Sequence, residues 1–183
     1  MEIWKTLSME SGITRHWKIG NRAFWIQKIE NGWKIAGKLE EDFAEEPLIE
    51  EEKEKPEDLP WSTVYSGKKS QSRLIPQLPD KPLLLKPDQE YTLFPGQTLK
   101  IYITAPIWIQ IKTFSSSDEK VLKEFPCCEL SNTWFGEVDS GELAYSSDSP
   151  IYENFSKIPF GYERIICPVG IRNTEDIPLD LIR

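Results

Sequence analysis

The 183-residue chain has little of what most catalytic sites use. It contains one histidine, His16, and lacks the spacings GxxxxGK[ST], GxGxxG after a strand, HExxH and paired CxxC. These absences exclude the phosphate-binding loop, the dinucleotide-binding turn and the common zinc sites. A lone histidine is more often a surface or capping residue than a general base or a metal ligand.

Cysteine is also scarce, since the chain has only Cys127, Cys128 and Cys167. Neighbouring cysteines can bridge each other only with strain, and His16 adds no paired-ligand spacing. We therefore expect no metal site, no cofactor, and buried or inert thiols. Because the N-terminus also lacks a signal peptide, the cytoplasm is the simplest location for the protein.

Long hydrophobic runs are missing as well, and none approaches the ~18 residues that a membrane helix needs. We therefore expect a soluble protein without membrane insertion. The net charge is −8, and residues 40–58 hold eleven acidic and two basic residues, which leaves the rest of the chain nearly neutral. A neutral body offers no basic groove, so nucleic-acid binding is excluded.

The acidic segment 40–58 predicts an acidic mobile loop, because its like charges repel and Phe43 is its only aromatic residue. The alternative is a helix over 45–55, where some Glu and Lys residues lie four apart. Little beyond Leu48 and Ile49 would attach such a helix to a core.

Residues 16–39 predict a β-hairpin with a two-residue turn at Asn31-Gly32, which places Glu30 opposite Trp33. Phe24, Ile26, Trp33, Ile35 and Leu39 then share one face, and Trp25, Gln27, Lys34 and Lys38 share the other. Trp17 and Ile19 belong to a preceding strand that ends in a turn at Gly20-Asn21.

The stretch QTLKIYITAPIWIQIK, residues 97–112, alternates apolar and mostly polar residues without losing phase at Pro106. Its length exceeds that of an ordinary strand, so we predict two strands, 97–104 and 107–113, bent at Ala105-Pro106 and feeding one core. The segment 162–173 predicts a strand that breaks at Pro168.

Other short strands follow, separated by Gly and Pro turns, and no long helical period is present. This pattern predicts an all-β fold, an antiparallel β-sandwich. We expect a single domain over residues 1–183, with the acidic loop inserted after the N-terminal hairpin region 16–39.

The richest polar segment is 129–148, where Glu137, Asp139 and Glu142 are weak catalytic candidates of the kind that a glycosidase uses in pairs. The alternative is a hairpin-rich surface whose acids are solvated, with Trp134-Phe135 anchored in the core. Trp25, Trp108 and Trp134 are candidates for ligand or partner binding. For the first two, the alternative is that a second layer covers their face.

Three stretches together resemble a known family. They are residues 16–36, the proline-rich PDKPLLLKP with the following PGQ and APIWIQI, and ELSNTWFGEVDSGELAYS followed by IICPVGIRN. They resemble an uncharacterised prokaryotic family known only as a domain of unknown function, and the likeness spans most of residues 16–183. Its most specific part is SNTWFGEVDSGELAY, with Trp134, Phe135, Gly136, Gly141, Glu142, Leu143 and Tyr145. The resemblance implies no reaction, cofactor or catalytic residue.

These observations favour a non-catalytic binding or protein-interaction domain, with a carbohydrate-active hydrolase using the 129–148 carboxylates as the alternative. The resemblance also implies members that continue past the position of Arg183. We therefore expect residues 177–183 to begin a strand whose partner is missing. Such an open edge, or the exposed tryptophan faces, predicts self-association as a symmetric dimer. As alternatives to self-association, the partner would be another protein or a carbohydrate.

Overall fold

The structure, a computed structural model, describes residues 3–52, 56–67, 71–115 and 118–181. Its regular elements in this part of the chain are β-strands and one short 3-10 turn, Phe155–Lys157, so the all-β prediction is confirmed. None of the described chain forms a helix long and apolar enough to span a bilayer. Contacts group the chain into two compact units, the first from Met1–Leu78 with Ile107–Glu129 and the second from Pro79–Pro106 with Leu130–Arg183. The organisation as a single domain stays a prediction.

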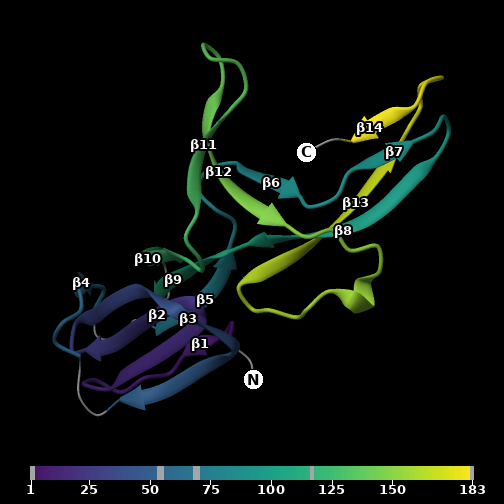
Figure 1. Ribbon diagram of the computed structural model, residues 1–183. Helices are drawn as coiled ribbons and strands as arrows, with labels where there is room; N and C mark the ends of the chain where they lie inside the picture. Colours follow the sequence, from purple (N-terminus) through teal and green to yellow (C-terminus); the bar gives the residue numbers. More distant parts are fainter. Residues whose placement is uncertain (1–2, 53–55, 68–70, 116–117, 182–183) are drawn as a thin grey trace. The chain divides into compact units, whose positions relative to one another are not determined.

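The first unit contains two antiparallel sheets (Figure 1). One has the order β1 (Thr6–Leu7), β5 (Gln71–Gln77), β9 (Trp108–Ser115) and β10 (Asp118–Pro126). The other has the order β2 (Thr14–Ile29), β3 (Gly32–Glu52) and β4 (Ser62–Tyr65). Among the residues that the structure describes, the largest fully buried apolar side chains all belong to this unit: Trp17, Trp33, Phe24, Ile3, Ile19, Ile26, Ile35, Leu74, Ile109 and Ile111.

Strand β2 doubles back on itself near Gly20, whose φ is 58°. The N–H of Gly12 donates a hydrogen bond of 2.7 Å to the carbonyl of Lys28. The ring of Trp17 stacks on that of Phe24 with centroids 5.5 Å apart. The two halves of β2 therefore lie side by side in opposite directions, as the predicted turn at Gly20-Asn21 requires.

The acidic segment is not a mobile loop where the structure describes it, because residues 40–52 belong to β3. This half of β3 pairs with the first half of β2, so that Arg15 lies opposite Glu51 and Lys18 opposite Leu48. The Lys18 ammonium contacts Glu40 at 2.8 Å and also binds Asp42. The cations of β2 thus offset the repulsion that the acidic composition alone suggests. Residues 53–55 of the predicted loop lie outside the described residues.

The predicted hairpin has the right faces but the wrong turn. Ile29 pairs with Gly32, so the turn residues are Glu30 and Asn31. Gly32 instead allows β4 to approach, because a Cβ there would lie 2.1 Å from the Val64 carbonyl oxygen. The pairing shifts by two residues, which preserves the alternation of faces.

The stretch 97–112 forms two strands, β8 (Thr98–Pro106) and β9, as predicted. The two strands do not feed one core, because β8 belongs to the second unit and β9 to the first. Pro106 is the last residue of β8, and Ile107 is the first residue of the next segment of the first unit.

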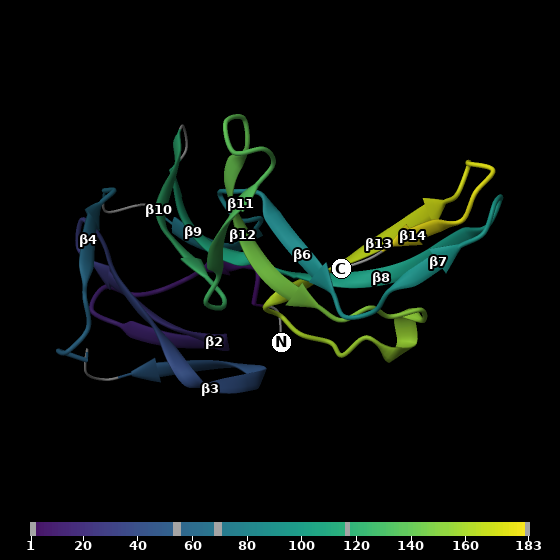
Figure 2. The same ribbon diagram turned by 45° about the horizontal axis from the view of Figure 1, so that its top comes forward.

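The second unit has three small sheets (Figure 2). The first contains β11 (Ser131–Phe135), β12 (Glu142–Ser149) and β6 (Leu83–Pro87). The second contains β13 (Arg164–Arg172) and β8, and the third contains β14 (Leu179–Leu181) and β7 (Tyr91–Leu93). Strand β13 does not break at Pro168, which lies opposite Tyr102. A proline is tolerated there because β13 pairs with β8 alone and keeps one edge open.

The chain end also differs from the expectation of a missing partner strand. Leu179 pairs with Leu93, and Leu181 pairs with Tyr91, so β14 has its partner within the chain. The buried side chain of Asn173 stabilises this pair, since its amide donates hydrogen bonds of 2.8 Å to the carbonyls of Leu93 and Ile177. Residues 182–183 lie outside the described residues.

Candidate functional site

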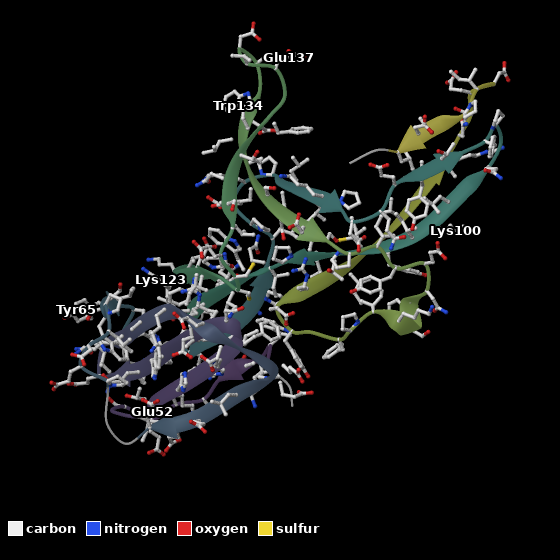
Figure 3. All side chains as sticks on the ribbon, viewed as in Figure 1. Glu52, Tyr65, Lys100, Lys123, Trp134 and Glu137 are labelled. Atoms are coloured by element: carbon white, nitrogen blue, oxygen red, sulfur yellow. The ribbon has the colours of Figure 1, made fainter. Side chains whose placement is uncertain are left out.

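Strands β11 and β12 form a two-stranded arm in the second unit. Trp134 lies opposite Leu143, and Phe135 lies opposite Glu142. Strand β6 joins β12 only from Tyr145 onwards. Residues 133–144 therefore extend beyond the third strand of their sheet, with Trp134 and Glu137 toward the far end (Figure 3); residues 131–144 are called the arm below.

Large apolar side chains are exposed on both faces of the arm. Trp134 and its cross-strand neighbour Leu143 are 50% and 46% exposed, and Phe135 on the opposite face is 52% exposed. Val138, in the connection between the two strands, is 93% exposed. Such a concentration of exposed apolar surface is typical of a site that another molecule covers.

The tip of the arm is ordered by its own backbone. The carbonyl of Glu137 accepts hydrogen bonds from the indole N–H of Trp134 at 2.9 Å and from the N–H of Gly141 at 2.7 Å. Gly136 has φ of 105°, which favours glycine, and a Cβ at Gly141 would lie 2.4 Å from the Trp134 indole nitrogen. The Trp134 ring is therefore held in one orientation before anything binds to it.

The three candidate acids are placed around this tip. Glu137 and Asp139 lie in the connection between β11 and β12, and Glu142 begins β12. All three residues are exposed. A glycosidase needs one carboxyl group in a desolvated site so that it stays protonated as the general acid, and the arm offers no such enclosure. Within the described residues, no group of three or more His, Cys, Asp or Glu side chains is placed to hold a metal ion.

A shallow apolar pocket lies at the base of the arm. It is lined by Pro82, Leu83, Leu84, Phe135 and Ala144, is partly open to solvent and has a cavity volume of about 80 Å³. Pockets for small molecules usually measure ~300–1,000 Å³. The size suits a single apolar side chain better than a cofactor or a sugar chain.

The other two candidate tryptophans lie in the first unit. Trp25 is only 6% exposed, and its ring stacks on that of His16 with centroids 4.4 Å apart. Its indole N–H donates to Glu52 at 3.0 Å. Trp108 is half-buried on β9, opposite Pro126 and Gln77. The ring face of Trp25 is thus covered from within the chain.

Sequence reasoning missed the grouping of His16 with Trp25 and Glu52, because it depends on β2 doubling back. Burial lowers the pKa of His16, although the Glu52 carboxylate, 3.6 Å from its Nδ1, acts in the opposite direction. The turn at Gly20-Asn21 was the only signal in the sequence that could have brought these three side chains together.

Comparisons with known proteins point to one family. No curated protein and no solved structure shows significant similarity to the chain. The family described as "Protein of unknown function (DUF432)" matches residues 3–183, which include both units and the whole arm. The chain therefore belongs to the DUF432 family.

Proposed function

We propose that this protein is a non-catalytic protein-interaction module that associates through its arm. The observation that carries the proposal is the exposure of Trp134, Phe135 and Leu143 on both faces of one short ribbon. Tryptophan is the residue type most enriched in binding hot spots, and a fixed ring loses little conformational entropy on binding. The hydrogen bond from Trp134 to the Glu137 carbonyl supplies that fixation.

The edge of β11 suggests how the partner binds. Strand β11, SNTWF, is the longest strand of the described chain that has an open side and contains neither a charged residue nor proline. The acidic half of β3 and the charged strand β10 show the protection that open edges usually carry. The unprotected edge of β11 therefore favours addition of a partner strand.

A second copy of the chain fits this edge. Two β11 strands related by a two-fold axis pair antiparallel without bringing like charges together, because the strand has none. Such pairing joins two three-stranded sheets into one, which removes the open edge from both copies. We propose the second copy as the partner, through β11 and not through the chain end, where β14 already pairs with β7.

The experiment is light scattering after size exclusion over a wide range of protein concentration. The variants are Asn132→Lys, which puts a charge on β11, and Trp134→Ala with Phe135→Ala. Tyr65→Ala is the matched control, because Tyr65 is 78% exposed on β4, another short uncharged edge strand. We expect a wild-type dimer that either arm variant weakens about tenfold or more and that the control leaves unchanged.

A wild type that stays monomeric, or arm variants that dimerise like the control, would contradict the proposal. A hydrolysis assay on a panel of glycans tests the alternative function in parallel. Turnover by the wild type that disappears when Glu137, Asp139 and Glu142 are changed to their amides would replace the interaction module with a hydrolase.

A further inference from the structure

The direction of the backbone groups of β11 is fixed by its neighbours in the sheet. The N–H of Tyr145 on β12 donates to the carbonyl of Pro82, next to β6, at 2.8 Å, so the backbone groups of Tyr145 point away from β11. Asn132 lies opposite Tyr145 on β11. In an antiparallel pair of strands, opposite residues exchange either both hydrogen bonds or none, and the two kinds of pair alternate. Asn132 therefore forms no backbone hydrogen bond to β12, and its N–H and C=O point to the open edge.

The same alternation assigns the other residues of β11. Trp134, two residues further along the strand, has the same orientation as Asn132, so its N–H and C=O also point to the open edge. Ser131, Thr133 and Phe135 direct their backbone groups to β12 instead. Any strand that adds to β11 must therefore form its hydrogen bonds with Asn132 and Trp134.

This orientation limits how a second copy can pair with β11 about a two-fold axis. Three arrangements remain: Asn132 opposite itself, Trp134 opposite itself, or Asn132 of each copy opposite Trp134 of the other. The last overlaps all five residues of β11 and forms two hydrogen-bonded pairs, which share four hydrogen bonds. Each of the other two arrangements forms only one such pair within β11. The third arrangement therefore satisfies the open edge best.

We propose that the second copy binds in this register, with Thr133 of both copies on the two-fold axis and Asn132 of each copy opposite Trp134 of the other. This register rests on the function proposed above and specifies the interface that it uses. Opposite residues in a sheet lie on the same face, so the axis is perpendicular to the sheet. Both Trp134 rings therefore lie on one face of the joined sheet, and both Phe135 rings lie on the other.

The side chains of β11 suit this register. Thr133 of the two copies forms a pair without hydrogen bonds, the kind in which Cα atoms are about 4.5 Å apart and side chains are closest. Threonine is β-branched and forms favourable cross-strand pairs with itself. Each large ring, of Trp134 or Phe135, then lies beside a shorter polar side chain of the other copy, Asn132 or Ser131. The register with Trp134 opposite itself would instead crowd two indole rings together.

Disulfide mapping in the full chain tests the register. Thr133→Cys places two thiols at the axis, where the expected Cα separation is within the range of roughly 4.4–6.8 Å that a disulfide spans. Ser131→Cys is the matched control on the same strand, because it lies four residues, about 13 Å, along the strand from its counterpart. Thr63→Cys is the control on β4, where Thr63 is exposed on another uncharged edge strand.

We expect oxidised Thr133→Cys to give about tenfold more linked dimer than either control. Peptide mass spectrometry locates the link at position 133 and distinguishes it from links through the three native cysteines.

Amide exchange in the wild type gives a second readout that needs no substitution. When the protein concentration is raised from monomer to dimer, as followed by light scattering, exchange of the Asn132 and Trp134 amides should slow about tenfold or more, because these N–H groups gain partners. The Thr133 N–H already points to β12, so its exchange rate should change less.

Three results would contradict the register, and they differ in what else they overturn. A Thr133→Cys protein that dimerises without a link at position 133 would overturn the register and leave the interaction module standing. A wild-type dimer whose Asn132 and Trp134 amides exchange as fast as in the monomer would overturn pairing through β11, and this readout decides the matter if Thr133→Cys does not fold. A wild type that stays monomeric at every concentration would overturn both the register and the proposed function.

Discussion

Replacing Gly37 by alanine tests how tightly the first unit closes around Phe125. A Cβ built on Gly37 would lie 2.7 Å from Cε1 and 2.8 Å from Cζ of the Phe125 ring. Carbon atoms in favourable contact are about 3.5–4.0 Å apart, so the ring or β3 would have to move by about 0.8 Å or more.

The ring has little room to move. Phe125 is 6% exposed, its centroid lies 5.9 Å from that of Phe24, and the Arg22 guanidinium lies over it. Overpacking of this kind costs about 1–3 kcal/mol. Alanine also restricts the unfolded chain, which favours folding by about 0.4–1 kcal/mol at an unstrained position. We therefore expect Gly37→Ala to lower the stability of the first unit by about 1–2 kcal/mol.

Native-state hydrogen exchange measures this effect unit by unit. Gly170→Ala in β13 is the matched control, because a Cβ there meets nothing within 4 Å, and stability of the second unit should be unchanged or slightly higher. Phe125→Leu should cost less in the Gly37→Ala background than in the wild type, since it removes the ring that the methyl group meets. Equal or greater stability for Gly37→Ala alone would refute the reasoning.

Three further predictions concern the polar contacts and the arm. The single histidine, His16, should titrate below its usual pKa of 6.5 because it is buried, so the stability it contributes above pH 6.5 is lost as the pH falls toward the lowered value. An NMR midpoint at or above 6.5 would contradict this. Hydrogen bonding from Lys18 lowers the pKa of Glu40, which adds stability above pH 4.5 that is lost as the pH falls through the lowered value. Lys18→Met should reduce this acid dependence in a pH series of unfolding curves, with Lys38 still paired to Glu40 at 2.9 Å, and should speed amide exchange over 44–51; an unchanged series would speak against the contact. Gly141→Ala should displace the Trp134 indole, change its fluorescence and weaken association, whereas dimerisation equal to wild type would show that the ordered tip is not needed.

Short-range patterns gave most of the strands, because alternation and turn residues act over neighbouring positions. The break between two strands at Pro106 follows from local chemistry. The turn at residues 30–31 did not, because the reason for Gly32 is the approach of Val64, a residue 32 positions away. A glycine needed for packing looks the same in sequence as one needed for a turn.

The prediction of a mobile loop from the charge of segment 40–58 failed for a related reason, because it also ignored a partner strand far away in the sequence. The like charges of segment 40–58 repel one another when the segment is taken alone, but residues 40–52 belong to a strand that pairs with β2, which carries Arg15 and Lys18. The candidate site was partly predictable, since Trp134 and the acids at 137–142 were identified in sequence. Their exposure, and the enclosure of Trp25 by His16, required the pairing of strands that no local pattern contains.

The division of the chain between two units has a consequence for synthesis. Strand β5 of the first unit pairs with β9, so Ser72 meets Thr113 only after the intervening residues 79–106, which belong to the second unit, have left the ribosome. During that interval the nascent chain presents β5 with one side unsatisfied. Completion of the second unit is also delayed, because β8 can pair with β13 only after residues 164–172 have left the ribosome. Each unit is thus completed by strands made after the other has begun, which favours slow folding and gives chaperones an open edge to bind.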